Sequence, residues 1–240
     1  MYENKIFMLL GQARCGSTLM MALISQLTQA HCYGELFQKG CGYSSEFDLR
    51  SYLAGVTGSR QESRVGFKML IDHLIFDDYP LSRRLGDLQE ALPEQVPVIN
   101  LERRNLVKTA LSLTIAMRHD KWLYRESTAE NPRLDEPVYI HPEEMNHMKN
   151  MLQAQRDFRD RFANVLNLDY ETHLQRPGVH QDTLNVVAEF IGVPRTKMTQ
   201  AELPAKTPIG KNWKQMIENF PEIESYWADD EVIGPMLRGD

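Results

Sequence analysis

The sequence predicts an α/β fold: a three-layer sandwich in which helices cover both faces of a central, mostly parallel sheet. Three observations support this prediction. Short apolar runs of strand length alternate with longer stretches of helical periodicity. The first run, residues 5–10, ends in a glycine-containing turn that leads directly into a helical pattern, as in a P-loop. The length of 240 residues suits one such domain, so we expect a single domain over 1–240.

In the first half of the chain, apolar periodicity and breaker residues delimit the expected elements. Residues 5–10 are a strand-length apolar run, and in residues 18–29 Leu19, Leu23 and Leu27 are spaced by four, as on one helix face. The pattern then predicts a strand around 31–33, a short helix over 46–54, a polar loop over 57–63, a strand over 65–71 and a helix over 82–92 ended by Pro93.

In the second half, strands and helices continue to alternate. The pattern predicts strands over 96–101 and 164–169, and helices over 106–118, 143–163 and 180–191. Residues 121–142 carry prolines and charges without a clear period, so we expect a long loop, and long loops in compact domains are often functional. The tail, 201–240, is rich in proline and glycine and is expected to be irregular.

Composition narrows the class of protein. Hydrophobic residues make up 42% and charged residues 25%, which is ordinary for a soluble globular protein. The net charge of −6 argues against a general nucleic-acid binder, because phosphate neutralisation needs a broad basic surface. The three cysteines show no paired spacing, and we find neither a signal peptide nor an apolar run of ~18 residues. We therefore expect a cytoplasmic protein without a membrane span.

The segment from Gly11 to Thr18 carries the strongest functional signal. Its spacing, Gly11-x4-Gly16-Ser17-Thr18, matches the nucleotide-binding pattern G-x4-G-K-[ST] except that Ser17 replaces the lysine. Glycines let backbone N–H groups face an anion, and the next helix adds its positive end. Without the lysine, we expect the loop to bind a phosphate-like group other than the β- and γ-phosphates of ATP.

Polar residues follow each predicted strand, at the edge where ligands bind to open parallel sheets. They are Gly34-Glu35, Asp72-His73, Arg103-Arg104 and Tyr170-Glu171. If Asn105 caps the helix over 106–118, Ser112 lies about two turns inside it. Arg104 and Ser112 could then bind one phosphate, which would be a second anion site besides the Gly11–Thr18 loop.

These motifs resemble those of P-loop sulfotransferases. Arg14, Gly16, Ser17 and Thr18 are similar to the family's 5′-phosphosulfate loop, and Arg104 with Ser112 is similar to its 3′-phosphate motif. Leu168-Asp169-Tyr170-Glu171 resembles the Tyr-Glu element whose tyrosine lies near the adenine. Tyr33–Phe37 and Gly66–His73 resemble segments of bacterial carbohydrate sulfotransferases of the nodulation-factor and trehalose types. Lys206-Thr207 before Asn212-Trp213-Lys214 is similar to a basic pair of the cytosolic enzymes, from which Thr207 and Pro208 depart.

The resemblance implies a sulfotransferase-like P-loop fold and a sulfuryl transfer from 3′-phosphoadenosine 5′-phosphosulfate (PAPS), leaving 3′,5′-adenosine bisphosphate (PAP). The acceptor would be a hydroxyl or amine of a saccharide or small molecule, with no metal ion required and the oligomeric state left open. The implied cofactor-binding residues are Arg14, Cys15, Gly16, Ser17, Thr18, Arg104, Ser112, Tyr170 and Lys206. Residues 41–62 and 121–142 carry no match and are expected to be acceptor-binding insertions.

The resemblance implies three catalytic residues. Arg14 would stabilise the charge that develops during transfer. The general base would be Glu35, which is similar to the base of the trehalose type, or His73, which corresponds loosely to the histidine of the cytosolic enzymes. The sequence leaves the choice between these two open.

Four other readings compete with a sulfotransferase. One is a small-molecule or nucleotide kinase with a degenerate P-loop, disfavoured by the missing lysine; another is a nucleotide-binding module without catalysis. A phosphocysteine enzyme built on Cys15 would need arginine at position 21, which is Met21. A metal site at His141 and His147 with Glu143 and Glu144 has a spacing that fits no common ligand pattern.

Overall fold

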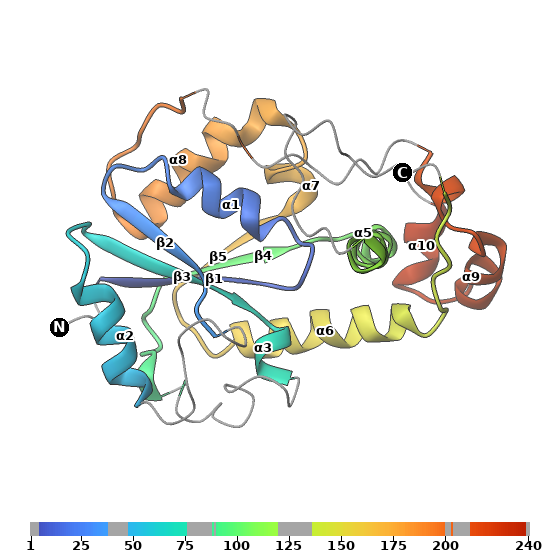
Figure 1. The fold of residues 1–240 in the computed structure, drawn as a ribbon, viewed down its shortest axis with the longest axis horizontal. Helices are drawn as coiled ribbons and strands as arrows, with labels where there is room; N and C mark the ends of the chain where they lie inside the picture. Colours follow the sequence, from blue (N-terminus) through green and yellow to red (C-terminus); the bar gives the residue numbers. More distant parts are fainter. Residues whose placement is uncertain are drawn as a thin grey trace.

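The computed structural model describes residues 5–37, 48–75, 88, 90–119, 136–199, 203 and 212–238. In this part of the chain, five strands form one parallel sheet in the order β2-β3-β1-β4-β5. The strands are β1 (Ile6–Gly11), β2 (Ala30–Glu35), β3 (Arg64–Leu70), β4 (Val98–Glu102) and β5 (Val165–Asp169). Helices flank both faces of the sheet (Figure 1), so the predicted three-layer α/β fold is confirmed.

The sheet separates two apolar cores. One face is covered by α1 (Ser17–Ile24), α7 (Tyr170–His173) and α8 (His180–Ile191), and the other by α2 (Leu49–Gly58), α3 (Asp72–Ile75) and α6 (Glu144–Arg159) (Figure 1). All six residues of β1 are buried. Because side chains alternate along a strand, Phe7 and Leu9 pack into the first core, whereas Met8 and Leu10 pack into the second.

A third core joins α5 (Leu106–His119) to the C-terminal region. That region contains η4 (Trp213–Met216), α9 (Phe220–Trp227) and α10 (Ile233–Arg238), and α10 packs against α5. The expectation of an irregular tail is therefore wrong for residues 213–238. Proline and glycine suggested breaks, but Pro221 and Pro235 lie in the first turns of their helices, where proline is tolerated.

Several predicted boundaries also shift. The α1 helix ends at Ile24 rather than at 29, because backbone bonds of the 3₁₀ type tighten the turn that follows it. The α6 helix ends at Arg159 rather than at 163 for the same reason. The α2 helix extends to Gly58, into the expected polar loop. The α8 helix has the predicted bounds, and most of the helix expected over 82–92 lies outside the described residues.

The topology brings three strand ends together. The chain leaves the central strand β1 for β2 and β3, and then crosses to β4 on the other side of β1. Gly11 is aligned with Leu70 of β3 and with Leu101 of β4, so the segments that follow these strands start side by side. Such a switch in strand order is where open parallel sheets bind ligands.

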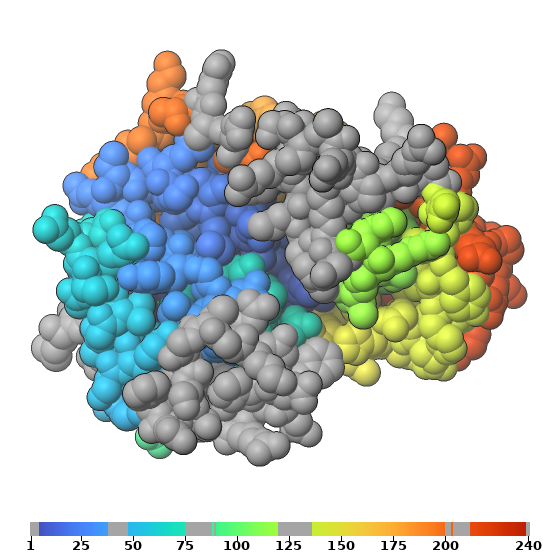
Figure 2. All heavy atoms as spheres, in the orientation of Figure 1, coloured from blue at the N-terminus to red at the C-terminus, as the bar shows by residue number. Residues whose placement is uncertain are grey.

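The outer surface follows the same arrangement. In Figure 2 the blue and cyan N-terminal segments cover one side of the molecule, and the green, yellow and red surfaces of α5, α6 and the C-terminal helices cover the other. No helix among the described residues combines the length and apolar character needed to cross a membrane.

Candidate active site

The loop from Gly11 to Ser17 connects β1 to α1 through two left-handed residues. Arg14 has φ 66°, and it is the one non-glycine residue with a positive φ in the described part of the chain. Gly16 has φ 96°, and a Cβ atom there would lie 2.7 Å from Cδ2 of Tyr170. Only glycine fits this position, because both the backbone conformation and the close ring exclude a side chain. Backbone turns of this kind form concave anion-binding sites.

Cys15 lies beneath this loop rather than on its open side. Its side chain is fully buried, and its backbone N–H donates to the carbonyl of Gln12 at 3.3 Å. Burial raises the pKa of the Cys15 thiol, so the reactive thiolate is disfavoured. The phosphocysteine reading therefore gains no support, and any contact of Cys15 with an anion would come from its backbone.

Ser112 links the loop to α5. Asn105 caps this helix as the sequence predicted, since its Oδ1 accepts the backbone N–H of Lys108 at 2.9 Å. Ser112 is buried two turns further on, and its Oγ accepts a hydrogen bond from Nε of Arg14 at 3.0 Å. The structure thus brings together a residue of the predicted 5′ loop and a residue of the predicted 3′-phosphate motif.

The two arginines after β4 point to different surroundings. Arg104 has a side chain that is 62% exposed, and it donates to Oδ1 of Asp169 at 2.7 Å and to Oγ1 of Thr172 at 2.8 Å. Arg103 is only 9% exposed and donates through Nη1 to the carbonyl oxygen of Arg14 at 3.3 Å. From the sequence we expected Arg104 and Ser112 to bind one phosphate, and we expected no particular role for Arg103. The apolar run of β4 does not reveal which arginine turns inward.

Tyr170 and Glu171 bring the end of β5 into the same site. The Tyr170 ring lies against Gly16, and the guanidinium of Arg103 lies 4.9 Å from the ring centroid. The two carboxylate oxygens of Glu171 accept the backbone N–H groups of Arg104 at 3.1 Å and Asn105 at 3.2 Å. The start of α5 therefore holds an anionic group of the protein itself, as expected for the positive end of a helix.

A second cluster lies at the ends of β2 and β3. Glu35 accepts from Nζ of Lys68 at 2.5 Å through Oε1, and its Oε2 lies 3.2 Å from Nε2 of His73. An irregularity in the β2–β3 pairing after Tyr33 aligns Glu35 with Lys68. Sequence reasoning assigned no role to Lys68, although a lysine inside an otherwise apolar strand was a usable signal.

Charge holds the Glu35 carboxylate ionised. Burial by itself would raise its pKa, but the hydrogen bond with His73 and the charge of Lys68 outweigh this and lower the pKa of Glu35 to about 2. Against an ionised carboxylate, Nε2 of His73 carries the proton and donates. The side chain of Glu35 is 20% exposed, compared with 9% for Lys68 and 1% for His73. The geometry thus favours Glu35 over His73 as the group that could accept a proton from a ligand.

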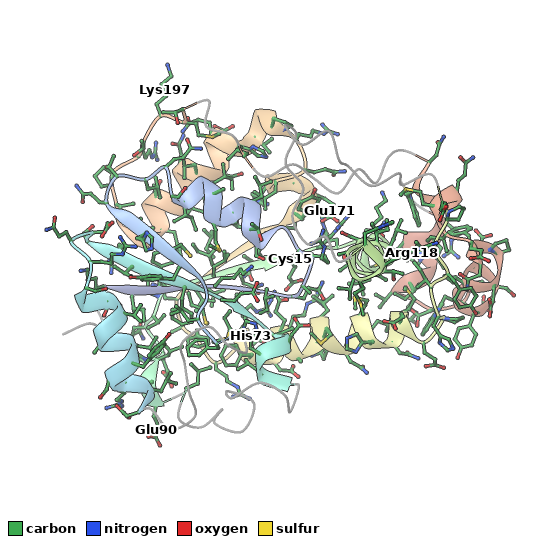
Figure 3. All side chains as sticks on the ribbon, in the orientation of Figure 1. Cys15, His73, Glu90, Arg118, Glu171 and Lys197 are labelled. Carbon is green, nitrogen blue, oxygen red and sulfur yellow. The ribbon has the colours of Figure 1, made fainter. Side chains whose placement is uncertain are left out.

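Two further polar groups border the loop, one partly buried and one fully buried. Burial raises the pKa of Asp72, which accepts a hydrogen bond from the backbone of Ala13. The side-chain amide of Gln12 is buried, and neither its nitrogen nor its oxygen has a hydrogen-bond partner within the described residues. Buried polar atoms without partners are uncommon, and they are expected where a ligand completes the site. Figure 3 labels Cys15, His73 and Glu171, which come from the loop after β1, from α3 and from α7.

Two sequence predictions find no test in this geometry. Lys206 lies outside the described residues, as do residues 41–47 and 121–135 of the two segments expected to bind the acceptor. In the part of the chain that is described, no three His, Cys, Asp or Glu side chains are grouped so that they could hold a metal ion.

Comparison with known proteins identifies the fold. No family model and no curated protein sequence matches the chain. Among solved structures, the chain is similar to mouse sulfotransferase SULT7A1 complexed with PAP, with a TM-score of 0.52 and 11% identity over 98% of this chain and 87% of that one. At this identity the likeness concerns the fold: the chain has the α/β fold of a sulfotransferase, with a parallel central sheet.

Proposed function

We propose that this protein is a PAPS-dependent sulfotransferase, which transfers a sulfuryl group to a hydroxyl or amine of a carbohydrate or small-metabolite acceptor. The observation that carries the proposal is that the Gly11–Ser17 loop, the start of α5 and the carboxylate-centred cluster around Glu35 lie at one edge of the sheet. The similarity in fold to a sulfotransferase complexed with PAP supports it.

Two separate anion-binding elements suit a nucleotide with phosphates at both ends of its ribose. In the proposal, Arg14, Gly16, Ser17, Thr18 and the backbone of Cys15 bind the 5′ side. Arg104 and Ser112 bind the 3′-phosphate, Tyr170 lies near the adenine and Lys206 adds a contact. To bind that phosphate, the Arg104 side chain leaves its ion pair with Asp169 and pairs with the phosphate instead. Its exposed position permits this movement.

The chemical step assigns a role to each charged group. PAPS would supply the sulfuryl group; a bond from the acceptor oxygen or nitrogen to sulfur forms while the bond from sulfur to the 5′-phosphate oxygen breaks. Glu35 accepts the proton of the acceptor, and Lys68 and His73 hold its carboxylate in place. Arg14 and the loop N–H groups stabilise the charge that remains on the departing phosphate. This step needs no metal ion.

The proposal extends to the organisation of the chain. We propose one sulfotransferase domain over 1–240, in which residues 41–62 and 121–142 contribute to acceptor binding. The motifs around Glu35 and Lys68 favour the bacterial carbohydrate type of enzyme. We also propose that it acts in the cytoplasm.

Thermal shift with two nucleotides tests the proposed donor. PAP should raise the unfolding temperature, whereas ATP with Mg²⁺ should not, because a ligand stabilises only the protein that binds it. Stabilisation by ATP–Mg²⁺ alone would contradict the proposal and favour the kinase.

A second experiment identifies the acceptor. The protein is incubated with PAPS and a panel of saccharides and small hydroxyl or amine compounds, and mass spectrometry detects the acceptor by the added sulfuryl mass.

A further inference from the structure

We propose that Arg103 positions the anion loop and supplies a buried positive charge that only a bound anion completes. The inference rests on the proposed function for the identity of the ligand, PAP or PAPS. Its structural part concerns the loop alone and can be tested without a ligand.

The first argument is the unusual setting of the Arg103 side chain. It is 9% exposed, and its Nε is buried without a hydrogen-bond partner. Within the described residues it forms no ion pair with a carboxylate, and the charge of Glu171 acts on it only from beyond ion-pair distance. Its Nη1 donates to a carbonyl oxygen, and the guanidinium faces the Tyr170 ring. Burying a charge without a directly paired counterion is costly. An anion in the neighbouring loop would provide the missing charge.

The second argument is the backbone that Arg103 contacts. Arg14 is in the left-handed region, which is unfavourable for a residue with a side chain. The carbonyl of Arg14 accepts the Arg103 hydrogen bond, which favours that conformation. Strained backbone of this kind persists at functional sites only where the surrounding structure holds it.

The third argument is that the Tyr170 ring contacts both Gly16 of the loop and Arg103. Its ring packs against Gly16 on one side of the loop and lies beneath the Arg103 guanidinium. Arg103 therefore connects the loop after β1 to the residue expected beside the adenine. The neighbouring Arg104 makes none of these contacts and binds Asp169 and Thr172 instead.

Three substitutions in the full chain separate charge from hydrogen bonding. R103K keeps the charge, R103Q keeps a donor without the charge, and R103M keeps neither. R118M is the matched control, because Arg118 is exposed near the end of α5 and binds Glu136 and Pro137 (Figure 3). Affinity for PAP is measured by titration calorimetry. We expect a loss of about 10- to 100-fold in R103M and R103Q, no more than about threefold in R103K, and no change in R118M.

Hydrogen exchange of residues 11–17 without ligand tests the positioning role. We expect faster exchange of this loop in R103M than in wild type or R118M, with unchanged exchange in β1. Wild-type exchange and wild-type PAP affinity in R103M would overturn the inference, as would an equal loss of affinity in R103K and R103Q. If R103M does not fold, the R103K and R103Q pair decides.

The ligand-free measurement also separates this inference from the proposed function. If wild type does not bind PAP and R103M still loosens the loop, the sulfotransferase proposal fails whereas the positioning role of Arg103 stands. If wild type binds PAP and R103M leaves both the loop and the affinity unchanged, the proposed function stands and the Arg103 inference fails.

Discussion

The two halves of the candidate site balance their charges differently. Around Glu35, one carboxylate lies between Lys68 and His73, so a buried charge is compensated by its neighbours. Around the loop, Arg103 is buried and forms no ion pair with any described carboxylate. Since a buried charge without an ion-pair partner is costly, we expect an anionic ligand to complete the loop half, whereas the Glu35 half is complete in itself.

Replacing Glu35 should produce the largest effect, because it removes the proposed general base. We expect Glu35→Gln to lower turnover by about 10²- to 10⁴-fold, the usual contribution of a general base. PAP affinity should stay within about twofold, since the loop half is untouched. Initial rates and calorimetry measure the two effects. Glu90→Gln is the control, because Glu90 is an exposed glutamate remote from the site (Figure 3). Undiminished turnover in Glu35→Gln would assign the role of general base to His73 instead.

Acid should weaken the compensated half next. The pKa of Glu35 is lowered from 4.5 to about 2 by folding, so its contribution to stability is present above the unfolded value and is lost as pH falls from about 5 to about 2. The difference amounts to at most about 3 kcal/mol. Urea unfolding of wild type and Glu35→Gln between pH 7 and 2.5 measures it. The stability gap between the two proteins should shrink as pH falls, and a constant gap would contradict the lowered pKa.

A side chain at Gly16 should damage the uncompensated half. In Gly16→Ala the new Cβ meets the Tyr170 ring and the residue keeps a left-handed φ, so we expect a stability loss of about 1–3 kcal/mol. PAP affinity should fall by about tenfold or more, because the loop moves away from its anion-binding shape. Gly178→Ala is the control, since nothing lies within 4 Å of its Cβ position. Equal PAP affinity in both variants would show that loop shape does not govern binding.

The smallest effect should come from the bond that joins the loop to α5. Ser112→Ala removes the acceptor of the 3.0 Å bond from Arg14, and with it a proposed ligand of the 3′-phosphate. We expect PAP to bind about 3- to 10-fold more weakly, the typical net value of one hydrogen bond. Ser63→Ala, an exposed serine bonded to the Gln29 carbonyl, should leave the affinity unchanged. Titration calorimetry compares the two, and equal affinities would remove Ser112 from the proposed site.

Local signals predicted most of the fold. Strand-length patterns located all five strands, and helical patterns located α1, α5, α6 and α8, because such patterns reflect which residues are buried. The C-terminal helices escaped prediction. Proline and glycine interrupt their sequence, and these short helices are stabilised by packing of apolar residues such as Ile223 and Trp227 in the core shared with α5 rather than by their own propensity.

The sequence predicted which residues belong to the candidate site better than it predicted the contacts between them. Strand-end reasoning listed Glu35, His73 and Arg104, since parallel strands deliver their following residues to one edge. It could not show that Glu35 is held by Lys68, which depends on the β2–β3 register.

The sequence alone determined the parallel α/β sheet and the loop whose spacing resembles a phosphate cradle without its lysine, because both depend on residues close together in the chain. The tertiary structure decided which charges are paired. Arg103 and Arg104 are neighbours of identical chemistry, yet one is buried beneath the loop and the other binds Asp169 in solvent. That difference depends on the position of β5 and α7, which are some 65 residues further along the chain, and no local pattern contains it.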